Sequence, residues 1–430
     1  MRIVFFTHKH ISHLFPIDDL LNLLSKYHDI FCVGYKEREE YFLNKNITFI
    51  PYPEKKFESL EKEINSLLKN EMIALKVNDI EKWYYYYSRK NAIKLHDITE
   101  SEIQKLIKEI EIIKPDLVFH DIVDLYAPII CNRLNIKRYD YITNPLYSEK
   151  YFNTNPEMLY SILTFRFLMD HKFIENNIKD YWNKQRDIYF DVEKYYGLIP
   201  IPPMNQFEMT GEKNIIFTCS FLQQQYDKNN SIIVPPHDNQ FKLEGTIDNE
   251  LIEFIKKKDK IIYISHGSFL TLDIEYYYRL LEELKEFNVS FIISCGKNLN
   301  NIKKVVDDKN MNSRVYCGSF LPQKYILNNA DLFITSGGFN SILESIYYKV
   351  PMLVDPISAE QRMNGYVIHE LGIGESLCLK ESIGKVKQIT KNLLFEKNYK
   401  KNVEKYNVLM KEEMSNRNEI VNSSLEKLIV

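Results

Sequence analysis

The stretch Asp331-Leu-Phe-Ile-Thr-Ser-Gly-Gly-Phe-Asn-Ser-Ile-Leu-Glu344 decides the fold of its half of the chain. Its apolar run ends at Thr335 and predicts a buried strand, and the two glycines that follow predict a tight turn. A helix is expected to start at about Asn340, with Ser341 in its first turn. Glycines let a ligand approach the backbone, and the N–H groups and dipole of a helix start favour an anion. The stretch therefore predicts an anion site, although a plain tight turn explains two glycines about as well.

The second half of the chain repeats this pattern of short apolar runs and amphipathic helices. Helical stretches such as Ile274 to Phe287 separate the runs, as in a parallel sheet covered by helices. The expected strands are Lys260–Ser265, Val289–Cys295, Arg314–Cys317, Asp331–Thr335 and Pro351–Val354.

The first half shows the same alternation. Its expected strands are Arg2–Thr7, Asp29–Val33, Ile47–Pro51, Asp116–His120 and Arg138–Thr143. Apolar residues at helical spacing predict helices at Ile17–Tyr27 and Leu125–Leu134. From about Tyr151 to Gly197 the chain is aromatic and charged, which predicts a helical insertion that lies outside the sheet and could cover a pocket.

The length of 430 residues exceeds the size at which one hydrophobic core usually stops growing, so two domains are expected. The segment Ile232–Asp248, with two adjacent prolines and little periodicity, is the expected linker. We therefore expect the α/β class, with two Rossmann-like, doubly wound domains that face each other across a cleft. The first comprises residues 1–235, including the insertion at 151–197, and the second comprises residues 249–398. In such sheets ligands bind beyond the carboxyl ends of the strands.

The composition favours neutral or small partners. A net charge of −3, with both signs interspersed, gives no broad field for nucleic acid or anionic membrane. No uncharged run approaches the roughly 18 residues of a spanning helix, and the apolar start at Met1–Phe6 is too short for a signal peptide. The six scattered cysteines form no C-x-x-C pair, which favours buried reduced thiols. We expect a soluble, cytoplasmic protein that binds neither nucleic acid nor membrane.

A longer pattern around the opening stretch resembles the donor-binding signature of family-one glycosyltransferases, particularly the bacterial macrolide type, which have the GT-B fold. The matching residues, in order and in register, are Phe320-Leu-Pro322-Gln323, Gly337-Gly338-x-Asn340-Ser341-x-x-Glu344, Val350-Pro351, Ala359-Glu360-Gln361-x-x-Asn364 and Leu371-Gly372. The resemblance extends more weakly over nearly the whole chain. It implies a UDP-sugar as co-substrate in the second domain, with glucose as the expected sugar, and C-terminal helices in residues 399–430 that pack back on the first domain.

The resemblance assigns roles within this signature. Phe320 stands where the family often has a tryptophan that stacks on the nucleobase, and Gln323 matches a neighbouring nucleoside contact. Glu344 matches the carboxylate that accepts both ribose hydroxyls. Glu360 and Gln361 match the pair that hydrogen-bonds the donor sugar. Without the motif, Phe320 would be interpreted as a core aromatic and Glu344 as a solvated helix charge.

One position departs from the family pattern. The family usually has His before the two glycines, where it contacts the diphosphate, and this chain has Ser336. A serine can donate one hydrogen bond but cannot become cationic. The substitution is therefore compatible with weaker diphosphate binding or with a different sugar donor. His266 could compensate, because Gly267-Ser268 matches a second phosphate-contacting turn, but a structural role explains this histidine at least as well. The expected diphosphate contacts also include Gly337, Gly338, Asn340 and Ser341.

A second motif, His8-Lys-His10-Ile-Ser12-His13-Leu-Phe-Pro, follows the first expected strand. The corresponding family loop reads Gly-His-x-Asn-Pro or Gly-His-x-Phe-Pro, and the run from Ser12 fits it with serine in place of glycine. The resemblance implies that His13 is the general base for the acceptor hydroxyl. A histidine pKa of about 6.5 suits that task. His8 and His10 have no assigned role.

The other ring nitrogen of such a base needs a carboxylate that fixes the tautomer. Asp121 is the expected partner, because its run resembles the family segment that carries one. Asp124 is expected a residue or more inside the following helix. Taken alone, Asp121 would be interpreted as a helix N-cap about as readily.

Two alternative functions each fit part of the sequence. The histidine run also resembles the T-H-x-H-x-D-H motif of metallo-β-lactamase-type hydrolases, in which His8, His10 and His13 would bind zinc. Ser12 occupies the Asp position of that motif, and the later ligands are missing. The other rival is a non-catalytic nucleotide-sugar-binding protein of the same fold, which the departure at Ser336 would fit.

The favoured function is inverting transfer of a sugar, expected to be glucose, from UDP to a hydroxyl of a small-molecule acceptor. The aromatic insertion suggests a hydrophobic or aromatic acceptor, such as a macrolide or polyphenol natural product. The helix start after Gly338 would offset the charge of the leaving diphosphate, so neither a metal nor a further cofactor is expected. A monomer or a homodimer is expected.

Overall fold

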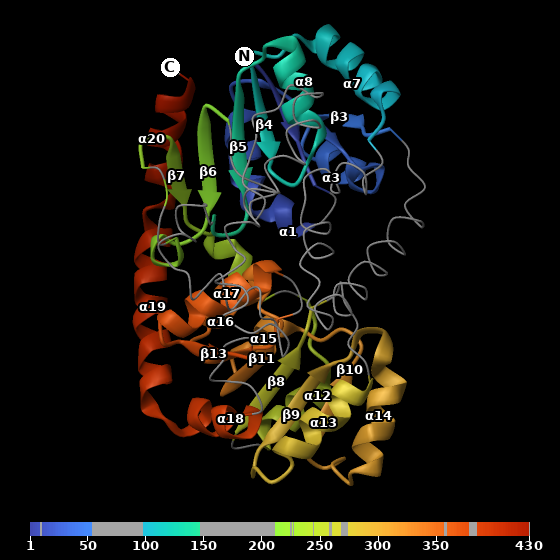
Figure 1. Ribbon diagram of the computed structural model, residues 1–430, viewed down its shortest axis with the longest axis vertical. Coiled ribbons are helices and arrows are strands. Elements are labelled where there is room, and N and C mark those ends of the chain that lie inside the picture. Colours follow the sequence, from blue (N-terminus) through green and yellow to red (C-terminus); the bar gives the residue numbers. More distant parts are fainter. Residues whose placement is uncertain are drawn as a thin grey trace, which may run out of the picture. The chain divides into compact units, whose positions relative to one another are not determined.

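The computed structural model describes residues 1–8, 11–53, 98–146, 211–223, 226, 228–243, 245–257, 260–267, 274–356, 359–377 and 385–429. These residues form two compact units (Figure 1). Among the described residues, one unit takes in those up to Pro236 together with those from Asn416 onward, and the other comprises those within His237–Ser415. The insertion expected at residues 151–197 lies outside the described residues.

The first unit contains a parallel sheet of seven strands in the order β3-β2-β1-β4-β5-β6-β7. The strands are β1 (Arg2–Phe6), β2 (Asp29–Gly34), β3 (Thr48–Pro51), β4 (Leu117–Asp121), β5 (Arg138–Ile142), β6 (Lys213–Phe217) and β7 (Ser231–Val234). In the register, Phe6 of β1 lies opposite His120 of β4, so the carboxyl ends of these central strands lie side by side.

Helices cover both faces of this sheet. The α-helices are α1 (Ile11–Leu14), α2 (Asp18–Leu24), α3 (Glu39–Leu43), α7 (Glu100–Ile113), α8 (Tyr126–Leu134) and α20 (Arg417–Ile429), and the 3-10 helices are η1 (Phe15–Ile17), η2 (Lys36–Arg38) and η4 (Ser220–Leu222). Because successive strand residues point to opposite faces, Ile3 and Phe5 pack with α1, α2 and α20, whereas Val4 and Phe6 pack with α7 and α8. This arrangement buries both faces, as parallel sheets require.

The second unit contains a parallel sheet of six strands in the order β10-β9-β8-β11-β12-β13. The strands are β8 (Ile261–Ser265), β9 (Ser290–Ser294), β10 (Val315–Gly318), β11 (Leu332–Thr335), β12 (Met352–Val354) and β13 (Gly374–Ser376). Ile262 and Ile264 of β8 lie in a buried core with residues of α13, α14 and α18.

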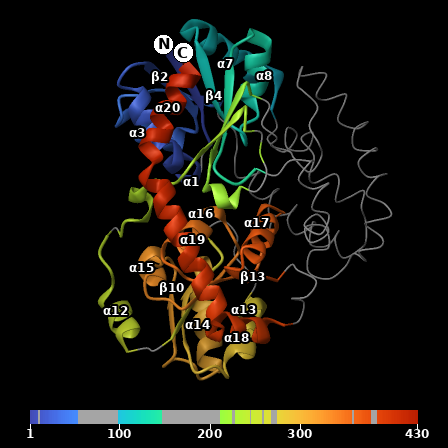
Figure 2. The same cartoon turned by 90° about the vertical axis from the view of Figure 1, so that its left-hand side faces the viewer.

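The helices of the second unit surround its sheet. They are α12 (Asn249–Lys256), α13 (Ile274–Leu284), α14 (Leu299–Asp308), α15 (Gln323–Leu327), α16 (Phe339–Tyr347), α17 (Ala359–Glu370), α18 (Val386–Phe395) and α19 (Lys397–Ser415), with 3-10 helices η5 (Asp238–Phe241) and η6 (Gly296–Asn298). Helix α19 lies beside α16 in both views (Figures 1 and 2), and Asn407 donates to the carbonyl oxygens of Ile346 and Tyr347. Helix α20, by contrast, packs on β7 of the first unit.

The fold class predicted from the sequence is confirmed. Each unit contains a parallel sheet covered by helices, and all ten expected strands are present. Two local expectations are wrong. The expected linker Ile232–Asp248 begins inside β7, since Ile232 and Ile233 pair in register with β6. Asp124 does not lie inside a helix, because α8 begins two residues later. No helix among the described residues has the length and apolarity that crossing a membrane requires.

Candidate functional site

The first cluster of expected site residues lies at the carboxyl end of the first unit's sheet. Asp121 is the last residue of β4, and His13 lies in the short helix α1 that follows β1. His13 Nδ1 lies 2.9 Å from Asp121 Oδ2. The side chain of Asp121 is 1% exposed and that of His13 is 17% exposed. The pair therefore joins a buried carboxylate to an imidazole that solvent can reach.

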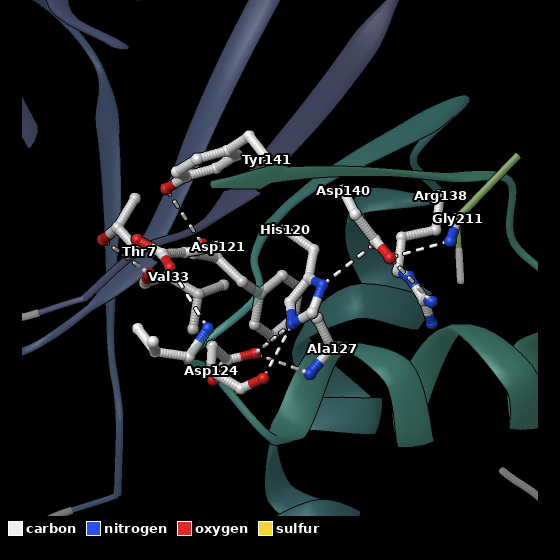
Figure 3. A network of polar contacts seen from close by, with 12 residues as sticks. Thr7, Val33, His120, Asp121, Asp124, Ala127, Arg138, Asp140, Tyr141 and Gly211 are labelled. Atoms are coloured by element: carbon white, nitrogen blue, oxygen red, sulfur yellow. Dashed lines mark hydrogen bonds and ion pairs between the residues drawn. The ribbon is translucent and has the colours of Figure 1, made fainter. Parts of the chain in front are cut away.

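The partners of Asp121 define the chemistry of His13. An ionised carboxylate only accepts hydrogen bonds, so His13 Nδ1 donates, and the Nε2 of the neutral ring is then the basic nitrogen. The second carboxylate oxygen, Oδ1, accepts from the backbone N–H of Val123 at 3.2 Å. Figure 3 shows Asp121 beside Tyr141, whose hydroxyl donates to the carbonyl oxygen of Phe6 at 3.4 Å. Hydrogen bonds from His13 and from the backbone of Val123 thus hold both carboxylate oxygens of Asp121.

Of the other two histidines of the motif, the structure describes only His8. The ring of His8 lies 4.7 Å from that of His13, centroid to centroid, and its edge faces Tyr35. His10 lies outside the described residues. Within the part of the chain that the structure describes, no three His, Cys, Asp or Glu side chains are grouped as metal ligands.

The second cluster lies at the turn from β11 to α16 in the second unit. Gly337 has a φ of 84°, and a Cβ there would meet Val354 Cγ1 at 2.6 Å, so the turn requires glycine. Gly338 is the N-cap of α16 and has no side chain to accept from the first N–H groups of the helix. The following residues, Asn340 and Ser341, lie in the first turn of the helix. A helix start with this geometry favours an anion.

Ser336, directly before the glycines, is buried and hydrogen-bonded within the protein. Its Oγ donates to the carbonyl oxygen of His266 at 3.2 Å and accepts from Gln361 Nε2 at 3.3 Å. Asn364 links the same turn to α17, because its Nδ2 lies 3.0 Å from the Gly337 carbonyl oxygen and 3.4 Å from Glu360 Oε1. The structure therefore brings Glu360 and Gln361 to the turn.

Two of the residues expected to bind the nucleoside, Gln323 and Glu344, lie together. Gln323 Nε2 donates to Glu344 Oε2 at 2.7 Å and to Ser341 Oγ at 3.2 Å. The hydroxyl of Tyr263, on β8, lies 3.4 Å from Gln323 Oε1 and fixes the orientation of that amide. Burial raises the pKa of Glu344, while the hydrogen bond from Gln323 and the charge of Lys324 partly offset this effect.

Phe320 is 76% exposed, unlike a core aromatic. His266 is buried at the end of β8, with Nε2 3.0 Å from the hydroxyl of Tyr276. Gly267 has a φ of 81°, and Ser268 lies outside the described residues. The sequence analysis did not identify Tyr263, in the middle of β8, or His120, the residue before Asp121 on β4, because their contacts depend on side-chain direction.

Residues 295–415 match the family of UDP-glucoronosyl and UDP-glucosyl transferases. The chain is 26% identical to the uncharacterized UDP-glucosyltransferase YdhE of Bacillus subtilis over 229 residues, which is 53% of this chain and 56% of that protein. It is 24% identical to the NDP-glycosyltransferase YjiC of the same organism over 285 residues, or 65% and 64% of the two chains. The chain thus matches less than two thirds of the length of these relatives.

Solved structures share the fold over nearly the whole chain. The glycotransferase of kitacinnamycin superposes with a TM-score of 0.64 at 14% identity, covering 97% of each chain. The calicheamicin glycosyltransferase CalG4 gives a TM-score of 0.62 at 15% identity, also over 97% of each chain. These likenesses confirm the expected GT-B fold.

Proposed function

Because residues 295–415 match the UDP-glucoronosyl and UDP-glucosyl transferase family, we propose that the protein is a UDP-sugar-dependent glycosyltransferase that acts on a small-molecule hydroxyl. The observation that carries this proposal is the cluster of Gln323, Ser341 and Glu344 beside the glycine turn of α16. A carboxylate with two oxygens suits a ribose, and a helix start suits a diphosphate.

In this proposal the nucleotide lies along the carboxyl edge of the second sheet. The exposed ring of Phe320 stacks on the base, and Glu344 accepts hydrogen bonds from the ribose hydroxyls while Gln323 holds it in place. The N–H groups at the start of α16, with Asn340 and Ser341, bind the diphosphate. In this proposal Gly267 and Ser268 complete the phosphate contacts, together with His266.

Ser336 acts on the donor sugar through its neighbour in this proposal. Its single hydroxyl hydrogen is directed at the His266 carbonyl, so Ser336 is poorly placed to donate to a phosphate. Its oxygen accepts from the amide of Gln361, which orients that side chain, and we propose that Gln361 binds a hydroxyl of the sugar. Glu360, oriented by Asn364, supplies a second acceptor for the sugar.

The proposed reaction is a single displacement with inversion. His13 Nε2 takes the proton of the acceptor hydroxyl, and the oxygen attacks the anomeric carbon. The bond from that carbon to the diphosphate breaks, and UDP leaves with the electron pair. Asp121 orients the ring of His13 and balances its positive charge after proton transfer. The start of α16 stabilises the leaving diphosphate.

The donor sugar and acceptor are the finer part of the proposal. Glucose is proposed because UDP-glucosyltransferases occur among the relatives. A hydrophobic or aromatic natural product is proposed as acceptor, since proteins with this fold include a spinosyn rhamnosyltransferase that was solved with the spinosyn aglycone. That neighbour is 13% identical, so it informs only the class of acceptor that this fold can hold.

Calorimetry with UDP and UDP-glucose, followed by incubation with an acceptor panel and mass-spectrometric detection, tests the proposal. We expect both nucleotides to bind and one acceptor class to gain the mass of a hexose. Absence of heat and of any thermal shift at millimolar nucleotide would refute it. Nucleotide binding without transfer to any acceptor would favour the non-catalytic alternative.

A further inference from the structure

A buried polar network surrounds His120, the residue before Asp121 (Figure 3). Alternation along β4 directs the two side chains to opposite faces of the sheet, Asp121 towards His13 and His120 towards α8. His120 Nδ1 lies 3.0 Å from Asp140 Oδ1, and His120 Nε2 lies 2.7 Å from the backbone carbonyl oxygen of Asp124. Both ring nitrogens therefore face oxygen atoms.

Asp140 is an ionised acceptor in this network. Arg138 donates to both of its carboxylate oxygens, at 2.6 and 3.2 Å, and the N–H of Gly211 donates at 2.7 Å. Burial alone would raise the pKa of Asp140, but hydrogen bonds and nearby positive charge, including Arg138 on both oxygens, hold it well below its usual range. An ionised carboxylate has no hydrogen to give, so the proton between Asp140 and His120 belongs to Nδ1.

The other side of the ring leads to the same conclusion. A carbonyl oxygen only accepts, so Nε2 of His120 also carries a hydrogen. Among the described residues, further titratable groups near the ring include the Asp124 carboxyl, 3.8 Å from Nε2, and the Tyr52 hydroxyl, which donates to Asp124. Burial raises the pKa of Asp124, an effect that the charge of a protonated His120 opposes. Two nitrogens that both donate define an imidazolium, and two carboxylates stand near it to balance its charge.

The network fixes the turn that follows β4. Asp124 N donates to the Asp121 carbonyl oxygen at 2.8 Å, and Asp124 Oδ2 accepts from Ala127 N at 2.8 Å. The bond from His120 Nε2 to the Asp124 carbonyl ties this turn back to the strand. Val123, whose N–H holds Asp121 Oδ1, lies within the same turn. A shift of the turn would therefore move the carboxylate that orients His13.

We propose that His120 is held as an imidazolium and serves as a positioning residue for Asp121, through its bond to the carbonyl of Asp124. Its role rests on the proposed function, in which Asp121 orients the base His13. His120 touches no reacting atom in this proposal. Its effect on turnover passes through the turn at residues 121–124.

Two conservative variants separate the two bonds. In His120→Asn the amide nitrogen replaces Nδ1, which keeps the bond to Asp140 and loses the bond to Asp124. In His120→Gln the amide nitrogen replaces Nε2, which keeps the bond to Asp124 and loses the bond to Asp140. We expect kcat to fall about tenfold to a hundredfold in His120→Asn, the scale of a small misplacement of a catalytic group, and to change by less than about threefold in His120→Gln.

UDP affinity, measured alongside, should stay unchanged in both variants because the nucleotide site belongs to the other unit. Unfolding temperatures provide the second control. If His120 has a purely structural role, the loss of kcat in each variant should be in proportion to its loss of stability. It should then not depend on whether the variant keeps the hydrogen bond to Asp124. Equal loss of kcat in both variants at equal stability would overturn the proposal.

Nitrogen-15 NMR of histidine-labelled protein tests the same idea without activity. We expect both ring nitrogens of His120, assigned with His120→Gln, to show protonated chemical shifts at neutral pH. The Nδ1 proton of His13, which reports its bond to Asp121, should be perturbed in His120→Asn and retained in His120→Gln. A deprotonated His120 nitrogen at neutral pH, or an unmoved His13 signal in His120→Asn, would overturn the proposal. Failure of the wild-type protein to bind UDP would instead refute the proposed function and leave these signals readable.

Discussion

The Nε2 of Gln323 donates a hydrogen bond of 2.7 Å to Oε2 of Glu344, although the two residues come from different helices, α15 and α16. The bond fixes a half-buried carboxylate at the carboxyl edge of the second sheet. The proposed ribose contact is thus preorganised, and its contribution can be measured.

Replacement of Glu344 by Ala should weaken UDP binding by about 1.5–3 kcal/mol, the scale of hydrogen bonds to a charged group. Calorimetry at fixed pH measures this loss. Glu275→Ala, an exposed glutamate on α13 of the same unit, is the matched control and should bind UDP normally. An unaffected Glu344→Ala variant would remove Glu344 from the nucleoside site.

Uridine binding should weaken as the pH falls. The midpoint of this loss should lie above the pKa of an ordinary glutamate. Burial raises the pKa of Glu344, so its carboxyl becomes protonated earlier as the pH falls. The ionised form accepts both ribose hydroxyls, so affinity is full above the raised pKa and is lost below it. Uridine is used because it carries no titrating phosphate. The acid-dependent loss should vanish in Glu344→Gln, and its persistence there would assign the effect to another group.

Ser336→Ala should weaken binding of UDP-glucose by about 0.5–1.5 kcal/mol and leave UDP binding unchanged, because the lost hydrogen bond orients Gln361. Gln361→Ala should lose at least as much, and the double variant should be little worse than Gln361→Ala. Calorimetry with both nucleotides measures these differences. Equal weakening of UDP and UDP-glucose in Ser336→Ala would instead make Ser336 a diphosphate contact.

Turnover should survive exhaustive chelation of metals, because the start of α16 and its hydroxyl and amide side chains stabilise the leaving diphosphate in the proposed mechanism. Activity before and after EDTA, with metal analysis of the purified protein, measures this. Stoichiometric zinc together with complete loss of activity would favour the hydrolase alternative, in which His8, His10 and His13 are ligands.

The sheets could be predicted from the sequence because their central strands are buried on both faces. Such strands are short apolar runs, and Ile261–Ser265 and Leu332–Thr335 lie within one residue of their expected limits. The strand Ser231–Val234 was mistaken for a linker because only three apolar residues precede its two prolines. A run that short forms a strand because it pairs with β6, and no local sequence pattern encodes that pairing.

The same limit applies to the sites. Residues at the ends of neighbouring parallel strands, such as Asp121, could be expected near His13 because parallel strands bring their carboxyl ends together. The hydroxyl of Tyr263 at Gln323 and the ring of His120 between Asp124 and Asp140 could not, since these contacts depend on side-chain direction and on the exact turn after β4. Propensity and spacing carry no information about either.

In the proposed mechanism His13, held by Asp121, is the general base. The most direct test is turnover of His13→Ala with UDP-glucose and an aliphatic alcohol acceptor, which needs more base assistance than a weakly acidic phenol. We expect a loss of about a hundredfold to ten-thousandfold at nearly unchanged UDP affinity, a slower Asp121→Asn variant, and a double variant little worse than His13→Ala. Near-normal turnover of His13→Ala with that acceptor would contradict the account.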